Sequence, residues 1–516
     1  MRRQNRDGAE TFVLGHISLF AEAWIFQSLG QPRVGSTIKS KPVLSAATKT
    51  AVTCAPQSVK ALTTQMNTWI AAFALMLCCA GAAAQTTVDI PIDDARVIAT
   101  RALRVGQDEL AIQIARRLLQ ANPDDRVALL VVAAVAPRQG NAAEGRRAGA
   151  RAWTLSQSDL QRYEAARLTA LAAANEKRFS LSEFWLRRAL TVSPSETETE
   201  RTSRDAAVVR RLNPWSTRLN LSVVPSNNVN GGADDDILTA PGQPDGSLSA
   251  DAQAVGGIRA TGSLRTQYRL FQTSEVRFSA ALQYQLSRVR VNEDGRDEGI
   301  SGSEFATDAA EISLIYEQAL DWGGVGAQLT FGDFDFGGDN YYDFRRTSIS
   351  WSGALNDTTA LQLAANHELQ SYESTGIRSV QRNSLLTSMS HRLTNGDRIS
   401  GTLGYTWSEG YSVNNTYDDW NLRGSYSWAD PFGPVSVSIN GGLRRTDYPD
   451  YNLPFGAVDG GREDLAVTYG LDLGLADFNY YGFSPGLSIS GSIADSNVSR
   501  FTRNTLSAGF TLRSIF

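Results

Sequence analysis

The last three hundred residues of the chain alternate between apolar and polar side chains, and this pattern constrains the fold more than any other feature. From Leu465 to Leu475, for example, every second residue is apolar or aromatic. A period of two is typical of β-strands, because successive side chains point to opposite faces of a sheet. We predict fourteen strands, in the ranges 216–224, 256–269, 275–289, 306–318, 324–334, 343–353, 359–371, 380–393, 398–408, 418–428, 434–446, 464–475, 483–494 and 503–516.

The links between these strands alternate as well, between short turns such as TNGD and ADPFG and long polar or acidic loops. The longest loops are predicted at 225–253, 292–304 and 449–461. An even number of strands, with short turns at one end and long loops at the other, is typical of a bacterial outer-membrane β-barrel. A closed barrel also pairs every backbone donor inside the bilayer. A soluble β-sandwich is the main alternative, but the alternation continues without the composition shift that a second sandwich domain would bring.

The predicted barrel, residues 213–516, ends on an aromatic residue, Phe516. The last strand of a barrel pairs with the first, so the chain can end where the cylinder closes. We expect Phe516 to face outer-membrane lipid and to help the barrel assembly machinery recognise the protein. Arg259, Arg265 and Arg269 fall on inward positions of the second strand, and we predict that they line a polar lumen. Fourteen strands enclose more space than about eight strands and less than a porin of about 16–18.

Residues 91–211 have the apolar period of α-helices instead, as Leu110, Ile114 and Leu118 illustrate. A Gly-Gln pair at Gly106 recurs as a Gly-Asn pair at Gly140, 34 residues later. Helix–turn–helix units with this period are typical of tetratricopeptide repeats. The third unit is out of register with the first two, so an ordinary helical bundle remains an alternative.

Arginine doublets are the candidate partner-binding residues of this helical region. A solvated helix face explains most of them, whereas a concave surface for an acidic or extended partner is the more specific interpretation. The doublets are Arg116 and Arg117, Arg146 and Arg147, and Arg187 and Arg188.

The N-terminal part of the chain indicates export. An apolar run from Trp69 to Ala84 ends in small residues, and it is too short for the roughly 20 apolar residues of a membrane-spanning helix. We predict a signal peptide at 59–84, with a start at Val59, and we interpret 1–58 as a mis-assigned or disordered extension. The three cysteines precede residue 85, so the mature chain is expected to contain no disulfide.

The junction between the two regions resembles one known family. In "NPWSTRLNLSVVPSNNVNGG", Pro214 and Trp215 precede the first strand, and Asn228 and Asn230 follow it. This stretch is similar to the start of the barrel in the surface lipoprotein assembly modifier family, and "SNVSRFTRNTLSAGFTLRSIF" is similar to its closing strands. The resemblance extends over roughly residues 91–516 and is strongest in the barrel.

The resemblance implies an outer-membrane translocator of the type XI secretion class. Its barrel would carry a client lipoprotein or related secreted protein to the cell surface. Its helical domain would bind the client, or a periplasmic chaperone, in the periplasm. The degenerate helical region leaves the client unidentified.

Other functions are less well supported by the sequence. An exopolysaccharide exporter also joins helical repeats to a barrel, but with longer repeat arrays, and a passive diffusion porin needs no helical domain. Catalysis is not expected, because His367 and His391 are the only histidines after the predicted signal peptide and lie on separate strands. The sequence indicates no cofactor and no metal site, and a net charge of −5 gives no sign of nucleic-acid binding.

Overall fold

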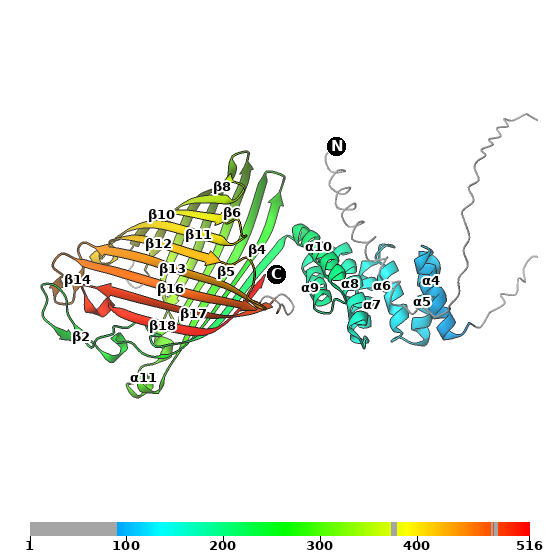
Figure 1. The fold of residues 1–516 in the computed structure, drawn as a ribbon, viewed down its shortest axis with the longest axis horizontal. Helices are drawn as coiled ribbons and strands as arrows, with labels where there is room; N and C mark the ends of the chain where they lie inside the picture. The colour runs from blue at the N-terminus through cyan, green and yellow to red at the C-terminus, as the bar shows by residue number, and fades with distance from the viewer. Residues whose placement is uncertain (1–89, 373–378, 476–477, 479–482, 516) are drawn as a thin grey trace, which may run out of the picture.

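The computed structural model describes residues 90–372, 379–475, 478 and 483–515. A helical region, residues 92–212, is followed by a closed β-barrel that begins at Trp215 (Figure 1). The predicted extension 1–58, the predicted signal peptide 59–84 and Phe516 lie outside the described residues. None of the described helices has both the length and the apolar character that crossing a bilayer requires.

Seven helices make up the described helical region, and each packs against the next along the chain. The helix α6 also contacts both α4 and α8, so three helix pairs, α4–α5, α6–α7 and α8–α9, stack side by side and α10 follows them. The assignment of these pairs to tetratricopeptide repeats stays a prediction. The helices are α4 (Ile92–Arg104), α5 (Asp108–Ala121), α6 (Arg126–Val135), α7 (Ala142–Thr154), α8 (Asp159–Asn175), α9 (Phe179–Thr191) and α10 (Glu196–Leu212).

The turn inside each helix pair has the same backbone conformation. Gly106, Gly140 and Lys177 all have a positive φ, of 75°, 83° and 60°. In each turn the next residue donates its backbone N–H to a carbonyl five residues earlier, that of Ala102, Ala136 or Ala173. This pattern closes helix ends at a left-handed residue. The third pair is out of register in the sequence because its turn follows the second by 37 residues (177 − 140) rather than 34 (140 − 106), and a lysine occupies the position that glycine holds in the other two.

The barrel contains the fourteen predicted strands, and every neighbouring pair is antiparallel. The last strand, β18, pairs with the first, β1, from Arg218 opposite Ile515 to Ser226 opposite Ser507, which closes the cylinder. The strands are β1 (Trp215–Ser226), β4 (Gly257–Gln272), β5 (Val276–Val291), β6 (Thr307–Leu320), β7 (Gly323–Phe336), β8 (Asp339–Asn356), β9 (Thr359–Ser371), β10 (Ser379–Arg392), β11 (Arg398–Gly410), β12 (Tyr417–Ser427), β13 (Val435–Tyr448), β16 (Arg462–Leu475), β17 (Phe483–Ser496) and β18 (Arg503–Ile515).

The barrel wall has two faces of opposite chemistry. Large apolar side chains on alternate positions, such as Leu221, Leu282 and Phe510, are between 42% and 75% exposed. We call these positions the outer face, because exposed apolar residues in a closed barrel meet lipid. The intervening positions, which we call the inner face, point into the lumen and carry mostly Ser, Thr, Gly, Asn, Gln and Arg.

The long loops gather at one end of the barrel, and they are folded. One apolar cluster contains Val229, Val255, Val291 and Ile300, and a second contains Tyr451, Val458 and Val498. One loop contains a short helix, α11, which Asn292 caps. The loop elements are β2 (Ile237–Leu238), β3 (Gly246–Ser247), η1 (Ala250–Ala252), α11 (Glu293–Asp297), η2 (Gly302–Phe305), η3 (Val413–Asn415), β14 (Asn452–Leu453), β15 (Gly456–Ala457) and η4 (Ser499–Phe501).

Candidate functional site

The lumen is the main candidate site, and the three predicted arginines all lie on the inner face of β4. Arg265 Nη1 donates to Gln283 Oε1 at 3.0 Å. Arg259 Nη1 donates to Ser287 Oγ at 3.0 Å, and its Nη2 bonds to the carbonyl of Val229 in the first long loop. Arg259 therefore ties that loop to the wall. Arg269, at the other end of β4, contacts the helical region instead.

Arg269 joins the barrel to the last helix. Its Nη2 lies 3.1 Å from the backbone carbonyls of Arg211, Leu212 and Asn213, at the C-terminus of α10. A cation is favourable there, because the last carbonyls of a helix have no partner within the helix and carry partial negative charge. The side chain of Asn213 accepts from Trp215 N at 3.1 Å and donates to Glu183 Oε1 at 2.8 Å. The junction is thus fixed by hydrogen bonds on both sides.

The start of the barrel uses the predicted asparagines to fold its first loop. Asn228 is buried and exchanges two hydrogen bonds with the backbone of Gly232. Asn230 Nδ2 donates to the carbonyl of Gln253 at 2.6 Å, and its Oδ1 accepts from Val255 N at 2.9 Å. Trp215 packs against Tyr268 with ring centroids 4.7 Å apart, at the opposite end of β1. The Asn-x-Asn motif therefore pins the two ends of the loop together.

A belt of arginines, carboxylates and aromatic rings crosses the inner face near the long loops. Arg346 pairs with Glu368 at 2.6 Å, and Arg444 pairs with Asp419 at 2.5 Å. The Arg462 guanidinium lies over the rings of the belt residues Tyr448, Tyr451 and Phe501. The two ion pairs join β8 to β9 and β12 to β13, and Arg462 joins β16 to the loop residues Tyr451 and Phe501.

Among the cavities that open on the inner face, two have volumes of about 530 and 580 Å³. The first has Arg423, Arg444 and Arg503 among small polar residues, and the second has Arg513 beside Asn220. No carboxylate lines either cavity. Such surfaces hold water and can hydrogen-bond a polar chain along the lumen.

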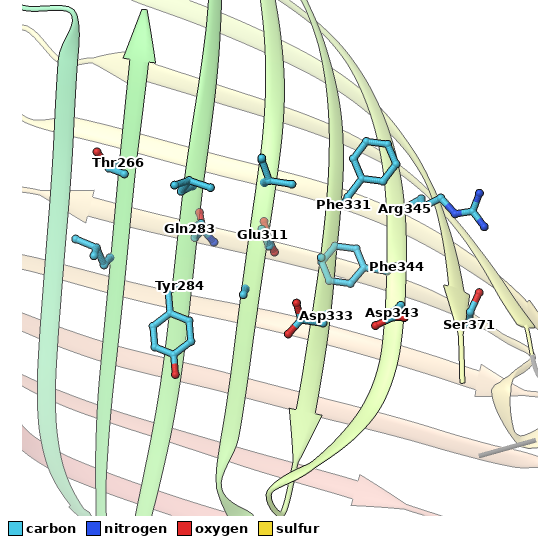
Figure 2. Close-up of a pocket in the computed structure, with 15 residues that line it drawn as sticks. Thr266, Gln283, Tyr284, Glu311, Phe331, Asp333, Asp343, Phe344, Arg345 and Ser371 are labelled. Atoms are coloured by element: carbon cyan, nitrogen blue, oxygen red, sulfur yellow. The ribbon is translucent and has the colours of Figure 1, made fainter. Parts of the chain in front are cut away.

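A larger hollow of about 970 Å³ lies on β4 to β9 (Figure 2). Its exposed apolar residues, among them Leu282, Ile312 and Phe331, belong to the outer face. Asp333 and Asp343, opposite each other in the β7–β8 pairing, line its end nearer the long loops. This hollow therefore faces the membrane and is no part of the conduit.

The arginine doublets mostly stabilise the helical stack. Arg116 pairs with Glu144 and Arg146 with Glu176, both at 2.8 Å and both between successive helix pairs. Arg187 pairs with the buried Glu183 at 3.2 Å, and burial lowers the pKa of this guanidinium. The remaining doublet residues differ, because Arg188 stacks over aromatic rings whereas Arg117 and Arg147 make no ion pair with a described residue. Arg117 and Arg147 are both exposed, and their role in partner binding stays a prediction.

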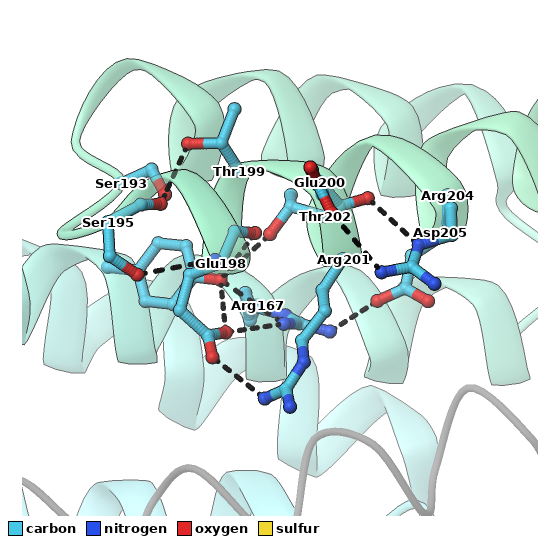
Figure 3. A network of polar contacts seen from close by, with 11 residues as sticks. Arg167, Ser193, Ser195, Glu198, Thr199, Glu200, Arg201, Thr202, Arg204 and Asp205 are labelled. Atoms are coloured by element: carbon cyan, nitrogen blue, oxygen red, sulfur yellow. Dashed lines mark hydrogen bonds and ion pairs between the residues drawn. The ribbon is translucent and has the colours of Figure 1, made fainter.

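A buried polar network holds α10 on α8 (Figure 3). Arg167 pairs with Asp205 and with Glu198, and Tyr163 Oη donates to Glu198 Oε2 at 3.0 Å. The Tyr163 hydroxyl also lies 2.8 Å from Thr202 Oγ1. Burial raises the pKa of the Asp205 carboxyl, against the opposing effect of Arg167. Polar contacts, rather than apolar ones alone, therefore position the helix that leads into the barrel.

Comparison with known families identifies the barrel. The sequence profile described as surface lipoprotein assembly modifier matches residues 215–508, more than half of the chain. The chain belongs to this family. No curated protein matches the chain.

The solved structures that resemble this family member share little sequence identity with it. OccAB3 of Acinetobacter baumannii is 10% identical, with 58% of this chain and 99% of that chain covered and a TM-score of 0.34. An outer membrane channel from Pseudomonas putida F1 is 12% identical, with 59% and 96% covered and a TM-score of 0.32. CdiB from Acinetobacter baumannii is 10% identical, with 58% and 60% covered and a TM-score of 0.32. The family match and the closed barrel together identify an outer-membrane translocator or channel.

The two histidines of this surface lipoprotein assembly modifier barrel lie apart. His367 Nδ1 is 2.7 Å from Asn383 Oδ1, and His391 Nδ1 is 2.9 Å from Thr359 Oγ1. Each thus contacts a residue of the neighbouring strand. Within the described ranges, no group of three or more His, Cys, Asp or Glu residues is arranged to hold a metal.

Proposed function

We propose that this barrel delivers surface lipoproteins or related secreted proteins across the outer membrane, and that the helical region binds the client or its chaperone in the periplasm. The family match carries the proposal, since the family is described as modifying the assembly of surface lipoproteins. The fixed junction at Arg269 and Asn213 supports it, because a helical domain held at the mouth of a barrel can hand a client to the lumen.

The strand topology supports an orientation of the barrel in the membrane. Both ends of the barrel, at β1 and β18, lie at the end with the short turns. Short turns in outer-membrane barrels face the periplasm and long loops face outward. The helical region, which precedes β1, is then periplasmic, and the folded loops cover the outside of the pore.

Apolar residues at the α4 end of the described helical stack support client binding. Ile92, Val97, Val105 and Leu110 are between 45% and 63% exposed on α4, on α5 and in the turn between them. Terminal repeats of a stacked array normally present a polar outer face to water. An apolar end, with the unpaired Arg117 on α5, suits a client segment that combines apolar and acidic residues.

A surface-exposure assay tests the proposal. The gene is expressed with each lipoprotein encoded beside it, and intact cells are treated with protease to measure how much lipoprotein is exposed. We expect exposure to require the full protein, to fall on deletion of residues 91–211, and to fall with Arg269→Gln but not with the outer-face variant Arg290→Gln. If no lipoprotein changes its exposure while conductance survives the deletion, a diffusion porin replaces the translocator.

A further inference from the structure

The charges of the barrel are sorted between its two faces. The inner positions of the fourteen strands hold fourteen arginines but only six carboxylates. Most other carboxylates of the strands lie on the outer face towards the long loops, as Asp333, Asp343 and Glu463 do. The lumen wall is therefore cationic, although the net charge of the whole chain is −5.

Each inner carboxylate is already paired with an arginine. The contacts are Glu311 with Arg346 at 3.8 Å, Glu317 with Arg277 at 2.6 Å, Glu368 with Arg346 at 2.6 Å, Asp419 with Arg444 at 2.5 Å, Asp464 with Arg462 at 2.5 Å and Asp472 with Arg513 at 3.1 Å. No inner carboxylate remains to neutralise the other arginines. Unpaired positive charge is thus built into the wall.

Four inner arginines make no ion pair or side-chain hydrogen bond with another described residue: Arg218, Arg392, Arg398 and Arg423. All four are exposed to the lumen. Arg423 borders the cavity of about 530 Å³ that no carboxylate lines. The other three lie near the short-turn end, where a client would enter.

Arg392 and Arg398 face each other directly across the β10–β11 pairing. Like charges in directly opposed positions destabilise a sheet, so this pair costs stability unless an anion joins it. The nearby Asp397 does not do so, because it is buried and its carboxylate accepts from Ala429 N at 2.8 Å and from Tyr426. The two opposed arginines therefore have no anionic partner among the described residues.

We propose that the lumen recognises acidic, extended polypeptide segments, with Arg392 and Arg398 as the first contact and Arg423 as a later one. This inference rests on the proposed function and names its client class. Guanidinium groups bind carboxylates with two parallel hydrogen bonds. A low-dielectric wall also focuses the field of like charges inside a channel. An extended chain of Asp and Glu residues fits this surface, and a polypeptide suits the family match better than an acidic polysaccharide does.

The test measures binding to the purified full-length protein in neutral detergent. The probes are short fluorescein-labelled chains of poly-L-glutamate, poly-L-lysine and polygalacturonate, followed by fluorescence anisotropy at low and high salt. The inner variant Arg392→Gln/Arg398→Gln is compared with the outer-face variant Arg290→Gln/Arg345→Gln. Arg290 and Arg345 are also exposed and make no ion pair with a described residue, so this control removes the same charge from the same barrel.

We expect poly-L-glutamate to bind, to weaken with salt, and to bind about two- to thirty-fold more weakly to the inner variant, with the outer variant unchanged. Equal binding of poly-L-lysine, or unchanged affinity in the inner variant, would overturn the inference. Binding of polygalacturonate without poly-L-glutamate would overturn the assignment to polypeptide. Because no lipoprotein is present, this result is independent of the cell assay, and either experiment can fail alone.

Discussion

Replacing Arg167 by methionine should destabilise the helical region far more than the loss of one surface charge would. Arg167 is only 7% exposed and contacts Glu198, Asp205 and Tyr163 at once. Methionine fills a similar volume but leaves the buried Asp205 without its ion-pair partner and leaves the buried Glu198 with only the more exposed Arg201. Breaking a buried ion pair from one side costs about 3–5 kcal/mol.

This loss of unfolding free energy lowers the urea concentration at which half of the helical region is unfolded. With a slope of about 1.5 kcal/mol per molar urea for a region of this size, the midpoint should fall by about 2–3 M. Arg201→Met is the matched control, because Arg201 contacts the same Glu198 at 2.8 Å from a position that is 38% exposed. An exposed pair contributes only about 0.2–1 kcal/mol, so this variant should lose less than about 1 M.

Pulse proteolysis of the detergent-solubilised full chain measures both values. Unfolded helical region is digested at each urea concentration, and the surviving full-length band is quantified against the barrel fragment. Equal midpoints for Arg167→Met and Arg201→Met would refute the reasoning, because they would show that burial of the network contributes nothing. Recovery of the midpoint when Glu198 and Asp205 are also replaced by apolar residues would confirm that the stranded carboxylates cause the loss.

Three further predictions concern other parts of the chain. Lys177→Gly should stabilise the helical region by about 0.5–1 kcal/mol in the same assay, because it relieves a left-handed backbone at a non-glycine residue; an unchanged midpoint would contradict this. Because burial raises the pKa values of Asp205 and Glu164 in the folded state, both groups should add stability as pH falls from 7 towards their ordinary pKa values. Asp205→Asn should flatten that rise, and an identical pH profile would count against it. Asn230→Ala should release the first loop, with protease cleavage of this loop on intact cells at least about tenfold faster, whereas unaltered cleavage would show that the asparagine does not hold it.

The sequence predicted the barrel well because its strands satisfy a simple local rule. The alternation around Leu363 or Leu403 arises because one face of each strand meets lipid. The strands could therefore be predicted from the local sequence without any knowledge of tertiary contacts. The helical repeat was harder to recognise, since Lys177 adopts the backbone that glycine adopts at the other two turns. The equivalence of the three turns lies in their shared positive φ and backbone hydrogen bond.

The contacts of the candidate site residues depend on which strands and helices lie next to each other, and a single sequence does not show this. Arg187 belonged to a doublet that suggested a partner, yet Glu183 holds it four residues away inside the stack. Arg269 was expected in the lumen wall, and its inner position agrees, but its guanidinium contacts α10. The opposition of Arg392 and Arg398 depends on the register of β10 and β11, which the sequence alone does not give.

The most direct measurement of the central claim is a disulfide across the closing seam. Ser222 on β1 lies opposite Thr511 on β18, whereas Thr505 is opposite Ser492 on β17. In outer-membrane preparations, Ser222→Cys/Thr511→Cys should cross-link spontaneously and Ser222→Cys/Thr505→Cys should not. A protein that stays in the soluble fraction, or that cross-links equally in both variants, would contradict a closed fourteen-strand barrel and the transport function built on it.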